Sequence, residues 1–102
     1  STVFDLFESL EIVEHVRKIT PYLEQKLEGL VQKYDCFSGR RGKGLMQGLM
    51  VEGRPVGEIV GNALKNGLVV ISAENNVLRL VPPLIIKEKD VDEMAEKLEA
   101  SL

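Results

Sequence analysis

The longest apolar pattern in the chain runs through its first third. Apolar side chains recur there at steps of three and four residues, which is the period of one face of an α-helix. They are Val3, Leu6, Phe7, Leu10, Ile12, Val16, Ile19, Leu23, Leu27, Leu30 and Tyr34. Pro21 interrupts this stripe without changing its phase. We therefore expect a long helix that is kinked at Pro21 rather than broken there.

Shorter patterns follow in the rest of the chain. They predict a buried strand at 45–51, a helix at 54–67, two strands at 68–72 and 77–81 joined by the turn "AENN", and a last helix marked by Val91, Met94, Leu98 and Leu102. Pro55 suits the first position of the middle helix, and Gly67 suits its end. This order predicts an α+β fold in which helices cover a small antiparallel sheet of about three strands.

The glycine-rich segment "GRRGKG", Gly39 to Gly44, lies between the first helix and the first strand. We expect it to form a flexible turn that lets the chain reach the sheet. It does not fit the phosphate-binding templates, because Gly42 and Gly44 lead into a strand and not into a helix. "GRRG" also matches the Gly-x-x-Gly of the KH nucleic-acid module. A stand-alone binding module, KH-like or regulatory for a small ligand, is therefore the alternative to an enzyme domain.

The composition limits the classes of function. The chain has 102 residues, 44% of them hydrophobic, which is the size of one small domain. A net charge of −3 gives no general attraction to nucleic acid or anionic membranes, and no apolar run is long enough to span a membrane. The single cysteine, Cys36, excludes an internal disulfide and suits a reducing compartment, so we expect a cytoplasmic protein. The start without methionine suggests that residues 1–102 are one domain of a longer chain.

Few residues other than arginine are candidates for chemistry. His15 has no second histidine and no neighbouring cysteine for a metal site, so we expect a partly packed helix residue. Cys36 is expected to be a small core residue. The acidic residues of the last helix are expected to form a solvated face, with one ion pair between Glu93 and Lys97: they are Asp92, Glu93, Glu96 and Glu99. The sequence therefore predicts neither a metal site nor an acid–base pair.

Arg79 stands alone in the apolar run "NNVLRLVPPLII". In an extended strand it shares its face with Val77 and Val81, while Leu78 and Leu80 point the other way. A guanidinium stays charged at working pH and is costly to bury without a partner. Arg79 therefore extends to solvent, pairs with an internal carboxylate, or binds an anion from outside.

Two segments of the chain resemble the class III, pyridoxal-phosphate-dependent aminotransferases. "RRGKGLMQGLMV", residues 40–51, is similar to the Arg-Gly-Lys-Gly-Leu-Met-x-Gly signature of that family's small domain. "NGLVVISAENNVLRLVPPLIIKEKDVDE", residues 66–93, resembles the segment that follows it in the family. The likeness covers nearly the whole chain and is strongest to members that act on N-acetylornithine. It implies a C-terminal α+β domain that follows a larger, cofactor-binding domain.

The resemblance also implies a role for Arg79. Arg79 matches the small-domain arginine that grips a carboxylate of the amino donor or of 2-oxoglutarate. The implied parent is a cytoplasmic, homodimeric enzyme of arginine biosynthesis that uses pyridoxal phosphate to move an amino group from N-acetylornithine to 2-oxoglutarate. The family's Schiff-base lysine belongs to the large domain, and neither Lys43 nor Lys65 matches it. This chain alone is therefore expected to bind no cofactor and to be inactive, and it is expected to have no nucleic-acid or membrane partner.

Overall fold

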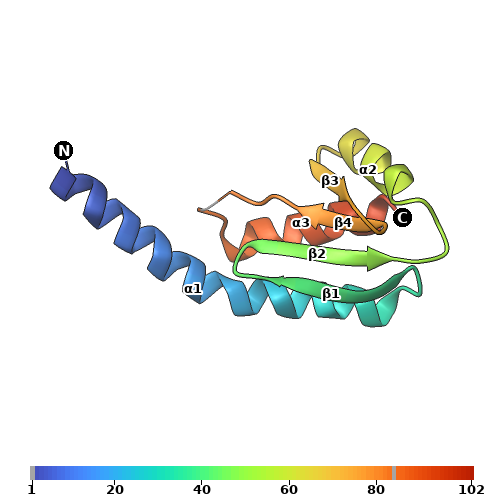
Figure 1. The fold of residues 1–102 in the computed structure, drawn as a ribbon, viewed down its shortest axis with the longest axis horizontal. Coiled ribbons are helices and arrows are strands. Elements are labelled where there is room, and N and C mark those ends of the chain that lie inside the picture. The colour runs from blue at the N-terminus through green and yellow to red at the C-terminus, as the bar shows by residue number, and fades with distance from the viewer. Residues whose placement is uncertain (1, 84) are drawn as a thin grey trace.

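The computed structural model of the protein describes residues 2–83 and 85–102. Within these ranges the elements are α1 (Thr2–Lys33), β1 (Phe37–Lys43), β2 (Met46–Val51), α2 (Val56–Lys65), β3 (Val70–Ala73), β4 (Val77–Leu80) and α3 (Glu88–Ala100). Figure 1 shows the long helix α1 running along one side of the sheet, with α3 and α2 beside the strands. The α+β class with a small antiparallel sheet is confirmed. The sheet has four strands in the described part of the chain, where about three were expected.

The helix α1 is continuous through Pro21, so the prediction that this proline does not break the helix is confirmed, while the kink stays a prediction. Pro21 is exposed, and the hydroxyl of Thr20 donates to the Val16 carbonyl at 2.6 Å one turn back. The second half of α1 buries one stripe of side chains at helical spacing: Ile19, Leu23, Leu27 and Leu30. Leu10 and Val13 are exposed, because this part of α1 projects beyond the sheet (Figure 1). Among the described side chains, the fully buried stripe therefore lies in the second half of the helix.

The expected turn at residues 39–44 is wrong, because most of this segment belongs to the strand β1. Residues 37–43 pair antiparallel with β2, so that Arg40 lies opposite Leu49 and Arg41 lies opposite Gly48. The actual turn is at Gly44 and Leu45, where Gly44 has a φ of 58°. Glycine takes this left-handed conformation without steric cost. Glycines weaken a strand locally, but here the pairing with β2 decides the structure.

The four strands follow the order β1-β2-β4-β3, and all neighbours are antiparallel. The predicted hairpin of β3 and β4 is confirmed, with Asn75 and Asn76 in the left-handed region at its turn. The Asn76 side chain also accepts a hydrogen bond from the Val56 amide at 2.9 Å and donates to the Val51 carbonyl at 2.8 Å. One turn residue thus joins the end of β2 to the start of α2.

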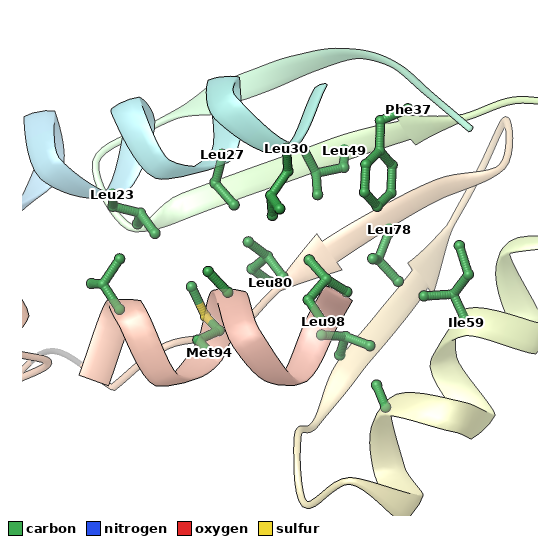
Figure 2. Close-up of a cluster of buried hydrophobic side chains, with 14 of the residues drawn as sticks. Leu23, Leu27, Leu30, Phe37, Leu49, Ile59, Leu78, Leu80, Met94 and Leu98 are labelled. Carbon is green, nitrogen blue, oxygen red and sulfur yellow. The ribbon is translucent and has the colours of Figure 1, made fainter. Parts of the chain in front are cut away.

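The core lies between one face of the sheet and the helices. Figure 2 shows side chains from α1, the sheet and α3 converging there: Leu23, Leu27, Leu30, Leu49, Leu78, Leu80, Met94 and Leu98. Side chains alternate between the faces of a strand, so Arg79, between Leu78 and Leu80, projects to the opposite face. That face is open, because Arg41, Ile71 and Arg79 are all exposed on it.

Two groups of polar side chains join α1 to α3. The Tyr22 hydroxyl donates to the Asp92 carboxylate, which also pairs with Lys26 at 3.1 Å. Seven residues further along α3, the Glu99 carboxylate accepts from the Tyr34 hydroxyl at 2.6 Å and from the Lys33 ammonium at 2.8 Å. Each of these groups combines a phenol, a carboxylate and an ammonium.

The carboxylates of α3 thus divide into two kinds. Asp92 and Glu99 are partly buried and hydrogen-bonded to α1, so the expectation of a uniformly solvated face is wrong for these two. The reason is that residues seven apart lie on the same side of a helix, and that side meets α1. The predicted ion pair of Glu93 with Lys97 is confirmed, at 3.0 Å. No helix in the described ranges has an apolar stretch long enough to cross a membrane.

Candidate substrate groove

A groove of about 710 Å³ lies on the open face of the sheet. All four strands and the β3–β4 turn contribute to it, and its lining includes Arg41, Gly48, Ile71, Glu74, Val77 and Arg79. Strand pairing explains this set, because Gly48 lies opposite both Arg41 and Arg79, and Arg79 lies opposite Ile71. These four positions form one row across the sheet. The groove therefore follows a line of residues at right angles to the strands.

Arg79 lines this groove with an exposed side chain. Its strand neighbours Leu78 and Leu80 are buried at 0% and 2% exposure, which fixes the direction of the guanidinium away from the core. None of the carboxylates whose side chains the structure describes forms an ion pair or hydrogen bond with Arg79. Arg79 therefore does not pair with a described carboxylate of this chain. The roles that remain are extension to solvent and the binding of an external anion.

Gly48 gives the groove its floor. A Cβ atom at this position would lie 3.1 Å from Cγ1 of Val77 and 3.9 Å from Cγ of Arg41. A side chain would thus occupy the space between the two arginines. Because Gly48 has none, the groove reaches the backbone of β2 between Arg41 and Arg79.

The neighbouring Arg40 points to the other face of β1 and has a structural role. Its guanidinium donates to Glu28 at 2.9 Å, to Glu24 at 3.3 Å and to the side-chain oxygen of Gln47 at 2.6 Å. Gln47 is only 1% exposed and in turn donates to the Gly44 carbonyl at 2.7 Å. This network binds the β1–β2 hairpin to α1, and Arg40 is not free to contact a ligand.

The KH-like alternative does not fit this geometry. A KH module clamps nucleic acid with a Gly-x-x-Gly loop. Residues 39–42 form part of β1 instead, paired with β2 along their length. The glycine-rich segment is therefore a sheet edge that carries one structural and one open-face arginine.

The remaining candidate residues have the packing roles that were expected of them. His15 is partly buried, and its Nε2 donates to the Ile86 carbonyl at 2.5 Å. Cys36 is partly buried against the core and has a free thiol. Among the described residues, no group of three histidine, cysteine or acidic side chains is arranged to hold a metal ion. The chemistry of the open face therefore rests on its arginines.

The structure adds Arg41 to the site. The local sequence pattern places it in a flexible turn together with Arg40. In a strand, the alternation of "RR" sends the two side chains to opposite faces. The signal for that strand is its pairing with β2, which is not visible in the local pattern.

Comparison with known proteins gives the family of the chain. Residues 1–102 match the model of the family described as aminotransferase class-III. The chain belongs to the class III aminotransferases. Acetylornithine aminotransferase of Caldanaerobacter subterraneus subsp. tengcongensis is 42% identical over 87 residues, which is 85% of this chain and 22% of that protein. The solved N-acetylornithine aminotransferase of Stenotrophomonas maltophilia K279a superposes with a TM-score of 0.79 at 31% identity, covering 89% of this chain and 26% of that one.

One relative of this chain is named for a different reaction, racemisation. A leucine/methionine racemase of Thermococcus litoralis is 31% identical over 98% of this chain and 25% of its own length. The chain thus spans about a quarter of the length of these relatives.

The described residues do not fit pyridoxal phosphate by themselves. In this family the cofactor is attached to a lysine, and the residues that line the Arg79 groove include no lysine. Lys43 and Lys65 are exposed on β1 and α2 and do not line the groove. The Arg79 groove therefore offers no lysine to which the cofactor could be attached.

Proposed function

We propose that residues 1–102 form the C-terminal, substrate-positioning domain of a class III aminotransferase, and that Arg79 binds a carboxylate of its substrates. The observation that carries the proposal is the exposed guanidinium on β4, which lines a groove and has no partner among the described side chains. A guanidinium presents a planar fork of donors that matches a carboxylate with two parallel hydrogen bonds. Ile71 and Val77 line the same groove as Arg79.

The proposed reaction moves an amino group from N-acetylornithine to 2-oxoglutarate, as in arginine biosynthesis. The names of the most similar relatives support this donor, and both proposed substrates carry a carboxylate for Arg79 to bind. When bound, pyridoxal phosphate acts as an electron sink for the carbanion formed in amino-group transfer. The cofactor, its lysine and the partner subunit of a cytoplasmic homodimer belong, in this proposal, to the part of the enzyme outside these residues.

A donor assay tests the reaction. The longer enzyme that carries these residues is purified with its cofactor and given N-acetylornithine, ornithine, 4-aminobutyrate or leucine, with 2-oxoglutarate as acceptor. We expect the highest kcat/KM for N-acetylornithine, measured as glutamate formed. Rapid racemisation of leucine without glutamate formation would assign the enzyme to the other reaction found among its relatives and contradict the proposal.

A further inference from the structure

We propose that Arg41 is a second anion contact in the Arg79 groove, and that the two arginines together make the groove prefer a dicarboxylate to a monocarboxylate. This inference rests on the proposed role of Arg79 and adds a specificity-determining residue to it. Arg41 is a residue of β1, and it lines the same groove as Arg79 of β4.

The register of the sheet places the two arginines on one face with a glycine between them. Arg41 lies opposite Gly48 of β2, and Gly48 lies opposite Arg79. Since neighbouring strands are spaced by about 4.8 Å, the two arginine Cα atoms are separated by roughly 9–10 Å. Gly48 contributes no side chain to fill that space. Two long side chains thus border a gap that is open down to the backbone.

The two arginines also differ from the other arginines of the chain. Arg17, Arg40 and Arg54 each have a carboxylate within 4.0 Å. Arg41 and Arg79 have no ion-pair or hydrogen-bond partner among the described side chains. Glu74, at the β3–β4 turn, is the one carboxylate among the described residues that line the groove, and it pairs with neither of them. The groove thus holds two cationic groups and one anionic group, an excess that favours an anionic ligand.

Two like charges on one face of a sheet repel each other, and an anion that contacts both relieves this repulsion. Each guanidinium binds one carboxylate through its planar fork, so two separated guanidiniums match two separated carboxylates. A monocarboxylate of similar length meets only one of them. A phosphate carries its charge at one centre and lacks a second, separated carboxylate for the other guanidinium. The expected ligand class is therefore a short dicarboxylate, the class to which 2-oxoglutarate and glutamate belong.

The test is a titration of the 102-residue chain, labelled for NMR, with glutarate, butyrate or inorganic phosphate at fixed ionic strength. Glutarate is used because it has no oxo group that could react with amines. The readout is the dissociation constant from shifts of the backbone amides and of the arginine Nε–H groups. The variants are Arg41→Gln, Arg41→Lys and Arg79→Gln. Lys43→Gln is the matched control, because it removes a positive charge from the same strand outside the groove.

We expect glutarate to bind about fivefold tighter than butyrate, the upper range for one added exposed ion pair. Arg41→Gln should abolish this preference by weakening glutarate binding more than butyrate binding, and Arg41→Lys should retain part of it. Lys43→Gln should leave the preference intact. A fold check by the dispersion of the amide spectrum accompanies each variant.

The other outcomes overturn one proposal or the other. If Arg41→Gln and Arg41→Lys keep the full preference while Arg79→Gln weakens both acids, Arg79 binds carboxylates but Arg41 selects nothing. Two further results would also show that Arg41 does not select dicarboxylates. They are a loss of the glutarate preference in Lys43→Gln as large as in Arg41→Gln, and tighter binding of phosphate than of glutarate. Either result would mean that the groove responds to the total charge of the ligand. If Arg79→Gln leaves both acids unaffected, the proposed role of Arg79 itself is wrong.

Discussion

Arg79 of β4 lies directly opposite Gly48 of β2, so the guanidinium has no side chain beside it on that neighbouring strand. The same row of the sheet continues to Arg41 on one side and to Ile71 on the other. The core packs against the opposite face, where Leu78 and Leu80 flank Arg79 along β4. The core thus lies on one face of the sheet, and the proposed ligand contact lies on the other. This separation makes the two roles of arginine in this chain testable by substitution.

Arg79→Ala is expected to leave the stability of the chain nearly unchanged, within about 0.5 kcal/mol, because an exposed side chain without a described partner is removed. Arg40→Ala is the matched comparison on the same sheet. It removes three hydrogen bonds and leaves the buried Gln47 oxygen without that donor, so we expect a loss of about 1–3 kcal/mol. Urea unfolding of the three chains measures both values. A large loss in the Arg79 variant would mean that this arginine is a structural residue.

The two polar groups between α1 and α3 predict a dependence of stability on pH. Hydrogen bonds from Tyr22 and Lys26 hold the pKa of Asp92 below its ordinary value of 3.8. Hydrogen bonds from Lys33 and Tyr34 hold the pKa of Glu99 below its ordinary value of 4.5. A carboxylate with a lowered pKa in the folded state stabilises the fold fully above its unfolded pKa, and this contribution is lost as the pH falls through the folded value.

The free energy of unfolding should therefore decrease as the pH falls below about 4.5, and Glu99→Gln should reduce that decrease. Glu96→Gln is the control, because Glu96 lies on the same helix, is exposed and forms no described ion pair. Denaturant unfolding at a series of pH values between neutral and acidic gives the comparison. Equal slopes for the Glu99 variant and the unmodified chain would show that the contact with Tyr34 and Lys33 does not contribute.

The packing of the core predicts how two leucine substitutions should change the stability of the chain. Leu98 of α3 is fully buried in the cluster of Figure 2, so Leu98→Ala should cost about 2–5 kcal/mol through lost burial and the cavity left behind. Leu64 of α2 is 65% exposed, and Leu64→Ala should change stability by less than about 0.5 kcal/mol. Thermal melts distinguish the two. Similar effects of both substitutions would contradict the placement of α3 against the core.

The helices and the hairpin could be predicted from the sequence because their signals are local. The stripe of Leu23, Leu27 and Leu30 has the helical period, and Gly67 ends α2 with a φ of 79°. The strand β1 could not be predicted, since its support comes from β2 and from the ion pairs of Arg40 with α1. Contacts between residues that are distant in the sequence produce no hydrophobic periodicity in the segments that they join.

The residues of the candidate site also differ in whether the local sequence gives a signal for them. Arg79 could be selected as a candidate from the sequence, because one charged residue in an apolar strand extends to solvent, pairs with a carboxylate or binds an anion. Arg41 could not, because its face follows from a strand that has no local signal. The pairing of Asp92 and Glu99 with α1 was likewise hidden, since the polar side of an isolated helix gives no sign of a tyrosine or lysine from another helix.

Pyridoxal phosphate should not form a specific adduct with this chain alone. The groove has no lysine in its lining. Hydrogen bonds to Asp92 and Glu99 raise the pKa of Lys26 and Lys33, which keeps these two amines protonated. The chain is mixed with equimolar cofactor, reduced with borohydride, and digested for mass spectrometry. We expect only scattered, substoichiometric labelling. A stoichiometric adduct at one lysine would overturn the conclusion that the cofactor is held outside these residues.

The most direct test of the central claim is the KM of Arg79→Lys in the longer, cofactor-loaded enzyme. Lysine keeps the positive charge but lacks the planar fork, so KM should rise for both N-acetylornithine and 2-oxoglutarate while the folded stability is unchanged. Arg79→Ala should cost about 2–5 kcal/mol of substrate binding, the range for removing one partner of a charge pair that the proposed cofactor-binding domain would bury. Unchanged KM values for both substrates in the two variants would show that Arg79 does not bind a substrate carboxylate.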